Sequence, residues 1–351
     1  MVVLAVVWTN YRNPTPMKAY KLHGPKSLEN FKLGDYDEPL ARDQEVKIQV
    51  KAVSLNFRDW ALANGRFGYP GEKLPFIPFS DAAGLVTEVG ASVTKFRAGD
   101  RVAVNFFPDW ADGAYSAAKT FRSLGGSTDG VLAEYVSFPE HAVTKVPDSF
   151  SFEEAAAFPC AGVTAWHALV EQARLRPTDT VLLQGTGGVS IFGLQIAKLM
   201  GARVIITSSS DEKLAQAQAL GADMLINYKQ TPNWEEKVRE LTQGEGADYV
   251  VEVAGQVARS YQALKAGGTI FQIGAVGGPS DEPVKPMAIL TQRLQGIYVG
   301  STQMLTDLLQ AFDRNQLKPV ISNTFRFEDA KEALAYMGSG SHFGKIVVQV
   351  G

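Results

Sequence analysis

Cysteine and histidine are scarce in this chain. Its 351 residues include one cysteine, Cys160, and four histidines. A single thiol cannot form an intrachain disulfide, which favours a reducing compartment, and we expect the protein in the cytosol. So few thiols and imidazoles also leave little material for a metal site built from Cys and His ligands.

The chain also lacks an excess of one charge and a long apolar run. Its formal net charge is −3, which gives no field that would gather nucleic acid or an anionic membrane. No stretch approaches the roughly 18 apolar residues of a membrane helix. The apolar start Met1–Trp8 lacks a positive segment and a small-residue cleavage site, so we expect residues 1–16 to be an N-terminal extension. A small molecule is therefore the expected partner.

What the chain does have is the composition of a globular protein with two domains. Hydrophobic residues make up 45% and charged residues 20%, and the length suits two separate cores. Glu45–Val53 alternates polar and apolar residues, and Leu85–Val89 and Gly99–Val104 repeat this character between Gly-bounded turns. These patterns predict an antiparallel, barrel-like β domain over residues 17–146.

The pattern changes near Pro147. Ser151 and Glu154 form a capping-box pattern that opens an Ala-rich helix. Expected strands then alternate with expected helices: strands Val181–Gln184, Val204–Thr207, Tyr249–Val253 and Thr269–Ile273, and helices Val189–Met200 and Asp211–Leu220. This alternation predicts an α/β fold with a Rossmann-type, doubly wound parallel sheet over residues 147–317. Residues 318–351 are strand-rich and are expected to rejoin the first domain.

A glycine-rich loop follows the first of these strands. Its residues are Gly185, Thr186, Gly187, Gly188 and Val189, and a helix is expected to begin within it. Glycines permit a tight turn and a close approach of backbone N–H groups to a pyrophosphate, while the helix N-terminus favours negative charge. Ser190 stands at the third glycine position. The strand, loop and helix together predict a dinucleotide site at these five residues.

The second strand of the unit favours NADPH over NADH. An NAD site carries an acid about 20 residues past the first glycine, on the ribose 2′-OH. Here the strand ends in hydroxyl residues, including Ser208, and Lys213 lies on the next helix. Hydroxyls and an ammonium suit a 2′-phosphate, which an acid would repel. In the alternative interpretation Ser209 only caps that helix, with Glu212 as its partner, and Lys213 is solvated.

Several segments together resemble the medium-chain dehydrogenase/reductase superfamily from Met17 to Gly351. They are Asn56–Asp59, Pro78–Gly84, Gly99–Val102, Pro159–Trp166, the loop at Gly185 and Ser341–Lys345. The resemblance implies a GroES-like catalytic domain beside the Rossmann domain. It also implies cofactor contacts by Lys213 and Tyr228, which touch the adenosine phosphate in quinone reductases, and by a looser set at Gly255, Ile273, Gly274, Phe343 and Lys345. A homodimer that joins the nucleotide-domain sheets is common among relatives.

The positions of the superfamily's catalytic zinc ligands depart from the zinc pattern. Asn56 stands at the first Cys position, Ser80-Asp81 replaces the His-Glu pair, and only Cys160 remains. One thiolate cannot supply the three protein ligands of a catalytic zinc. The chain thus resembles the zinc-independent branch, which includes quinone oxidoreductases and zinc-type alcohol dehydrogenase-like proteins, and we expect no metal.

Without a Lewis acid, hydride addition to an enone or a quinone is easier than reduction of a simple ketone, because the developing charge is delocalised. We therefore expect NADPH-dependent reduction of quinones or α,β-unsaturated carbonyls, with Asn56 and Arg58 orienting the substrate carbonyl. Alternatively, Asn56 satisfies buried backbone and Arg58 pairs with Asp59. Two other functions stay open: a metal-free alcohol or ketone oxidoreductase, and a non-catalytic NADPH-binding protein. We expect Cys160 to be a buried apolar side chain rather than a nucleophile.

Overall fold

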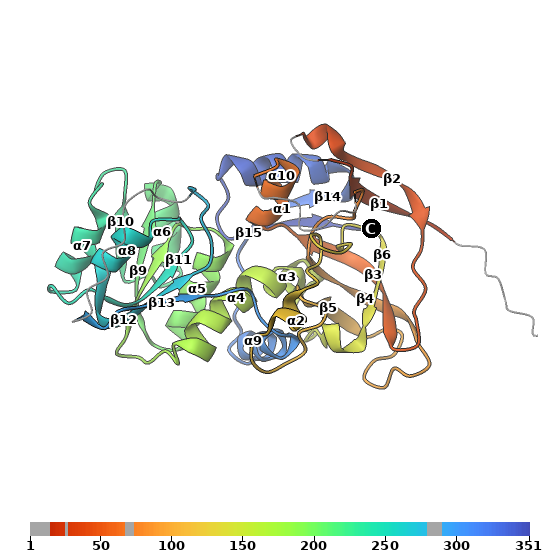
Figure 1. Ribbon diagram of the computed structural model, residues 1–351, viewed down its shortest axis with the longest axis horizontal. Coiled ribbons are helices and arrows are strands. Elements are labelled where there is room, and N and C mark those ends of the chain that lie inside the picture. The colour runs from red at the N-terminus through yellow and green to blue at the C-terminus, as the bar shows by residue number, and fades with distance from the viewer. Residues whose placement is uncertain (1–14, 25–26, 67–73, 279–289) are drawn as a thin grey trace, which may run out of the picture.

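Two large β-sheets organise the chain into two lobes (Figure 1). The computed structural model describes residues 15–24, 27–66, 74–278 and 290–351. Most of the predicted extension, residues 1–14, lies outside the described residues, and Pro16 already pairs with Asp37 in a strand. Strands β1 (Pro16–Leu22) and β2 (Phe31–Asp37) form a separate antiparallel pair.

The second lobe is built on a parallel sheet of six strands. Their spatial order is β10-β9-β8-β11-β12-β13. The strands are β8 (Thr180–Gln184), β9 (Arg203–Ser208), β10 (Met224–Asn227), β11 (Ala247–Glu252), β12 (Leu264–Gln272) and β13 (Arg293–Gly296). In order of sequence this is the 3-2-1-4-5-6 arrangement of dinucleotide-binding folds, so the predicted Rossmann-type sheet is confirmed.

Helices cover the two faces of this sheet, and its central strand β8 is buried along its whole length. Such burial is expected for a strand with helices on both sides. The helices that follow the strands are α5 (Gly188–Leu199), α6 (Asp211–Ala219), α7 (Trp234–Leu241) and α8 (Val257–Ala263). The cap of α6 is Ser210, whose side chain accepts from Lys213 N, and not Ser209 as the alternative interpretation had it.

The first lobe is built on a seven-stranded sheet in which β3 and β4 form the longest pairing. The order is β14-β15-β3-β4-β5-β7, with β6 also paired to β3. Its strands are β3 (Glu45–Ser54), β4 (Asp81–Val89), β5 (Arg101–Val104), β6 (Tyr135–Pro139), β7 (Val143–Lys145), β14 (Ile321–Arg326) and β15 (Lys345–Gln349). Strand β15 pairs antiparallel with β3, so the end of the chain returns to its first sheet. Helices α1 (Phe57–Ala63), α2 (Ala117–Thr120) and α10 (Ala330–Ser339) belong to the same lobe.

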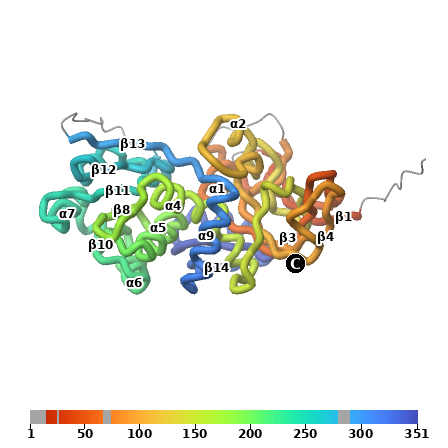
Figure 2. The backbone as a smooth tube through the Cα atoms, turned by 90° about the horizontal axis from the view of Figure 1, so that it is seen from below, coloured from red at the N-terminus to blue at the C-terminus, as the bar shows by residue number. Residues whose placement is uncertain are grey.

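The helical segment between the lobes is not one regular helix. The capping box at Ser151 and Glu154 is present and opens α3 (Phe152–Ala156). Two π-helical stretches then flank α4 (Val163–Trp166): Phe158–Gly162 and His167–Gln172. Pro159 cannot donate a backbone hydrogen bond, which removes one link of a regular helix here. Helix α9 (Thr302–Arg314) packs against α4 and β7 at the junction of the lobes (Figure 2).

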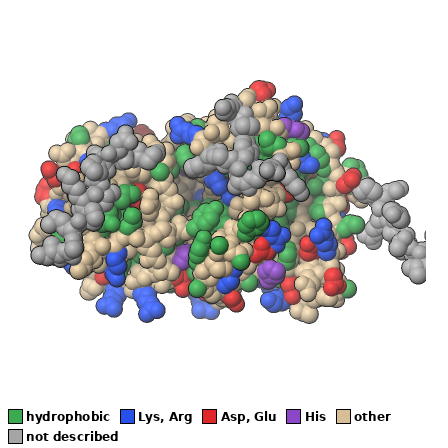
Figure 3. Space-filling model, viewed as in Figure 1, with side chains coloured by type: hydrophobic (Ala, Val, Ile, Leu, Met, Phe, Trp, Pro, Cys, Tyr) green, Lys and Arg blue, Asp and Glu red, His purple; other side chains and the backbone are tan. Residues whose placement is uncertain are grey.

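The surface shows no accumulation of one charge on the face drawn in Figure 3, where basic and acidic side chains are interspersed. Among the described residues, no helix is long and apolar enough to cross a membrane.

Candidate functional site

The glycine-rich loop forms a tight turn between β8 and α5. Gly185 has a φ of +73°, a conformation that side-chain-bearing residues rarely adopt. Its N–H donates to the hydroxyl of Thr207 on the neighbouring strand at 3.2 Å. The Ser190 hydroxyl donates to the carbonyl of Gln184 at 2.7 Å, so the residue at the third glycine position ties the helix back to the strand. The turn therefore has the shape that places free N–H groups at a helix N-terminus.

The end of the chain lies against this loop. Gly344 N donates to the Thr186 carbonyl at 3.0 Å, and Gly187 and Gly344 form a parallel bridge. A Cβ added at Gly188 would come within 2.8 Å of Lys345 Cδ, so the lysine stem lies directly over this glycine. The loop and the closing segment Ser341–Lys345 thus form one site, although they are far apart in the sequence.

The two other residues predicted beside these segments lie close by. Val189 is half-buried in the first turn of α5. Phe343 is buried in the core rather than presented on the surface. Its contact with a cofactor stays a prediction.

The ends of β9 and β10 form a small polar region for the adenosine side of a dinucleotide. Ser208 is buried, and its carbonyl accepts from Tyr228 N at 3.0 Å. The Tyr228 side chain is 42% exposed and free to meet a ligand. Lys213 Nζ donates to the carbonyl of Gly340 at 2.7 Å, and burial lowers the pKa of this ammonium. The structure therefore brings Ser208, Lys213 and Tyr228 to one end of the sheet.

The acid that follows β9 is hydrogen-bonded to side-chain amides at the end of β10 and beyond it. Asp211 accepts from the side-chain amides of Asn227 at 2.6 Å and Gln230 at 2.8 Å. Both oxygens of its carboxylate thus accept a hydrogen bond from a side-chain amide.

His342 is a site residue that sequence reasoning left out. An added Cβ at Gly187 would lie 3.9 Å from its Nε2, so the imidazole faces the glycine-rich loop. Burial lowers the pKa of His342 to about 4, and the charges of Lys213 and Lys345 add to the effect. The imidazole is therefore neutral at physiological pH.

Glu252 was also missed, and it shapes the turn that contains Gly255. Its Oε1 accepts from the backbone N–H groups of Ala254 at 2.9 Å, Gly255 at 2.9 Å and Gln256 at 3.2 Å. Burial raises the pKa of this carboxyl. A carboxylate at the carboxyl end of a parallel strand was the available sequence signal. Gly255 itself has a φ of +87°, which explains why glycine stands there.

The positions that carry zinc ligands in the superfamily form a closed cluster of hydrogen bonds. Asn56 Nδ2 donates to Ser80 Oγ at 3.3 Å, and Ser80 Oγ donates to Asp81 Oδ1 at 2.6 Å. Lys345 Nζ enters the same cluster, donating to Asn56 Oδ1 at 2.7 Å and lying 3.7 Å from Asp81 Oδ2. All four residues are buried.

This donor set does not fit zinc. Cys160 contributes its backbone N–H, which donates to Asp81 Oδ2 at 3.0 Å, while burial and the charge of Asp81 raise the pKa of its thiol. A raised thiol pKa opposes the thiolate that zinc requires. An ammonium beside Asp81 further opposes a second cation. Within the described ranges, no group of three or more His, Cys, Asp or Glu side chains could hold a metal.

Arg58 and Asp59 lie on the far side of Asn56. Arg58 donates to the Leu124 carbonyl, its guanidinium stacks 4.2 Å from the Phe106 ring centre, and it lies 3.9 Å from Asp59 Oδ1. Asp59 Oδ2 accepts from Asn56 N at 2.8 Å. The alternative interpretation of Arg58 thus has a structural counterpart, since it pairs loosely with Asp59, whereas its contact with a substrate stays a prediction.

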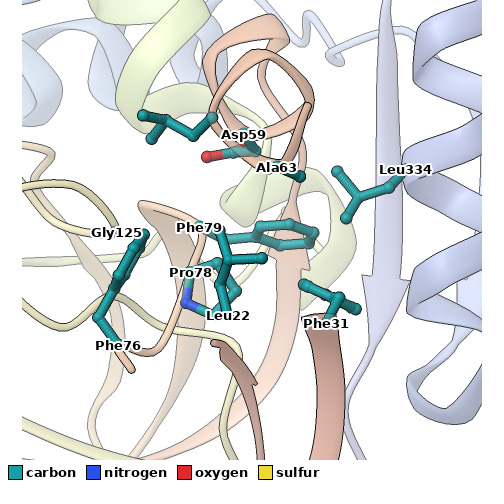
Figure 4. A pocket seen from close by; sticks show the side chains of 10 residues that line it. Leu22, Phe31, Asp59, Ala63, Phe76, Pro78, Phe79, Gly125 and Leu334 are labelled. Carbon is teal, nitrogen blue, oxygen red and sulfur yellow. The ribbon is translucent and has the colours of Figure 1, made fainter. Parts of the chain in front are cut away.

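The Asp59 carboxyl lies in apolar surroundings. Figure 4 shows it beside Ala63, Phe79 and Leu334. Burial raises the pKa of Asp59 to about 6, in spite of the nearby guanidinium and the N–H of Asn56. This carboxyl therefore titrates close to neutrality.

A cavity of about 790 Å³ is lined in part by Ile273 and Gly274, two of the residues predicted to contact the cofactor. Its aromatic lining includes Trp110, Tyr115 and Tyr298. The centre of the Tyr298 ring lies 6.3 Å from that of Phe106, and the Arg58 guanidinium stacks on the Phe106 ring. Phe106 therefore lies between a ring that lines the cavity and the guanidinium of Arg58, two residues after Asn56.

A Rossmann sheet with a glycine-rich loop, beside a second lobe that brings polar residues to the loop, defines a dinucleotide-dependent oxidoreductase. Two family models match the chain: a zinc-binding dehydrogenase model over residues 188–314 and an alcohol dehydrogenase GroES-like domain over residues 42–148. The chain belongs to the medium-chain dehydrogenase/reductase superfamily of NAD(P)-dependent oxidoreductases. The predicted GroES-like domain is thereby confirmed.

Full-length relatives carry several names. A zinc-type alcohol dehydrogenase-like protein of Schizosaccharomyces pombe is 38% identical, over 94% of this chain and 99% of its own. The structure of an NAD-dependent alcohol dehydrogenase is 34% identical, with a TM-score of 0.86, over 95% of this chain and 100% of its own. The quinone oxidoreductase of Coxiella burnetii is 27% identical, with a TM-score of 0.77, over 96% and 100%.

Proposed function

We propose that this protein is a zinc-independent, NADPH-dependent reductase of quinones or α,β-unsaturated carbonyls. The observation that carries the proposal is the buried cluster at the zinc-ligand positions, where the Lys345 ammonium lies between Asn56 and Asp81. Without a Lewis acid, hydrogen-bond donors must stabilise the negative charge that develops on the substrate oxygen. A conjugated acceptor delocalises that charge, so its reduction depends least on such donors.

The glycine-rich loop and the ends of β9 and β10 support the choice of NADPH. The loop fits the pyrophosphate through its N–H groups at the start of α5, and Gly255, Ile273 and Gly274 line the path toward the cavity. Ser208, Lys213 and Tyr228 offer a hydroxyl, an ammonium and a phenol to a 2′-phosphate, while the Asp211 carboxylate accepts from the amides of Asn227 and Gln230. NADPH, when bound, supplies the hydride, and a proton from water completes the reduction.

The residues of the chain orient the substrate and exclude water. The Asn56 amide presents an N–H to the carbonyl oxygen, and Arg58 holds Phe106 beneath the rings that border the cavity. Trp110, Tyr115 and Tyr298 provide flat surfaces on which a ring-shaped substrate stacks. The similarity to a named quinone oxidoreductase agrees with such a substrate.

The test is a comparison of acceptors. NADPH oxidation is measured with phenanthrenequinone and with small enones, and against simple ketones and primary alcohols at equal concentrations. We expect turnover of the conjugated acceptors to exceed that of the ketones by orders of magnitude. Preference for simple ketones or alcohols would instead favour the metal-free alcohol or ketone oxidoreductase, and tight NADPH binding without any turnover would favour a non-catalytic protein. A cytosolic homodimer is the form in which we expect the enzyme.

A further inference from the structure

Lys345 is a buried cation whose head group is satisfied entirely by the first lobe. The residue is 2% exposed. Its Nζ donates to the carbonyl of Leu55 at 2.7 Å and to Asn56 Oδ1 at 2.7 Å, and the Asp81 carboxylate lies 3.7 Å away. Only the stem of the side chain touches the glycine-rich loop, over Gly188. The ammonium is therefore directed away from the loop and toward the candidate catalytic amide.

This contact determines which way the Asn56 amide points. An ammonium has three donors and no acceptor, so only the amide oxygen can face it. The NH₂ group must then face Ser80, whose hydroxyl hydrogen is already committed to Asp81. Within the described part of the chain, Nδ2 makes this one hydrogen bond, which leaves a second N–H to donate.

All hydrogen bonds of the cluster run in one direction. Lys345 donates to Asn56, Asn56 donates to Ser80, and Ser80 donates to Asp81, whose carboxylate closes the ring beside the ammonium. Chains of hydrogen bonds polarise one another at low dielectric, and a positive charge on the amide oxygen strengthens the amide N–H as a donor. The ring thus fixes both the orientation and the strength of that donor.

We propose that Lys345 is a positioning residue that sets the Asn56 amide to donate to the substrate carbonyl oxygen. The donation from Asn56 to a substrate carbonyl rests on the proposed function, whereas the orientation of the Asn56 amide does not. The ammonium contributes the positive charge that a metal contributes in zinc-dependent relatives, but it acts through a neutral amide.

The test combines Lys345→Met, Asn56→Leu and the double variant. We expect Lys345→Met to lower kcat on the order of 10- to 100-fold, the range expected when a hydrogen bond to a charged group is lost. The Kd for NADPH should change less than about 3-fold. In the Asn56→Leu background, Lys345→Met should lower kcat by less than about a further 3-fold. Equal losses in both backgrounds would overturn the proposal, as would a weakened NADPH Kd with unchanged kcat.

Two further variants serve as a matched control and as a replacement if the single variant unfolds. Lys318→Met removes a lysine of the same C-terminal region whose ammonium bonds Glu154 near the surface, and it should leave kcat unchanged. Lys345→Met leaves Asp81 buried without its cation, so Lys345→Met/Asp81→Asn is the version to use if the single variant unfolds. It removes both charges and should show the same loss of kcat; full activity in this variant would overturn the proposal.

Failure of the proposed function would be visible separately, as a wild-type protein that reduces no quinone or enone. The side-chain amide NMR signals of Asn56, identified by their loss in Asn56→Leu, need no substrate. They should move in Lys345→Met and stay in place in Lys318→Met. Unchanged Asn56 signals in Lys345→Met would contradict the assignment of the amide orientation.

Discussion

The Lys213 ammonium donates to the carbonyl of Gly340 at 2.7 Å, which joins the start of α6 to the turn after α10. This contact holds the ammonium near enough to His342 for its charge to lower the pKa of that imidazole. A phosphate bound there would gain a donor that is already oriented and partly desolvated.

Replacing Lys213 with Glu should therefore change cofactor preference. We expect the Kd for NADPH to rise roughly 10- to 100-fold and that for NADH to change little, because only NADPH carries the 2′-phosphate. Fluorescence titration of both cofactors measures this. Lys237→Glu, the same charge change on α7, is the control. Equal losses for the two cofactors in Lys213→Glu would refute the phosphate assignment.

The buried carboxyl of Asp59 should make stability depend on pH. Its pKa rises from the ordinary 3.8 to about 6 on folding, so between these values the folded state binds more protons than the unfolded state. Stability is then lost as pH rises from about 4 to about 6, by about 3 kcal/mol. Urea unfolding of wild type and Asp59→Asn across this range isolates the effect. A constant difference between the two proteins at every pH would contradict the raised pKa.

The aromatic cavity should select substrates by ring surface. Tyr298→Ala should raise the KM for phenanthrenequinone about 2- to 12-fold, which corresponds to the loss of one aromatic contact, and should change the KM for a small enone less. Phe121 is 80% exposed and does not line the cavity, so Phe121→Ala is the matched control. A uniform change across substrates of all sizes would show that Tyr298 acts elsewhere.

Metal removal should leave activity intact. Because Lys345 and the protonated thiol of Cys160 oppose a cation beside Asp81, we expect purified protein to carry far less than stoichiometric zinc. Elemental analysis and NADPH-linked assays before and after EDTA dialysis measure this. One zinc per chain, with activity lost on dialysis and restored by zinc, would refute it.

The one thiol of the chain should be inert in the native state. Burial raises the Cys160 pKa, so the thiolate that reacts with iodoacetamide is scarce. We expect no alkylation of folded protein at pH 8 and complete alkylation in denaturant, followed by mass spectrometry. Rapid native labelling with loss of activity would reveal a reactive thiol instead.

Local sequence patterns predicted the Rossmann lobe well. The turn at Gly185, the strand β8 and the start of α5 follow from adjacent residues, because glycine geometry and apolar runs act over a few positions. The cap of α6 was misplaced by one residue, since Ser209 and Ser210 are chemically alike and only backbone geometry separates them.

The candidate site was harder to predict because its contacts cross the whole chain. The resemblance singled out Lys345 as a cofactor contact, yet its ammonium meets Asn56, 289 positions earlier. The π-helical stretch at Phe158–Gly162, which carries the Cys160 N–H that donates to Asp81, has no clear local signal either. Periodicity describes which face of an element is buried, but not which distant polar group completes a hydrogen bond.

The pairing of β15 with β3 has a consequence for biosynthesis. The first half of β3 pairs with β6, but Ala52–Ser54 pair with β15, which begins only at Lys345, so this end of the strand has no partner on that side until β15 has been synthesised. Loop closure over so many residues is slow, and unpaired strand edges attract other chains. The end of β3 in the nascent first lobe therefore stays unpaired along one edge until the distant β15 has been made.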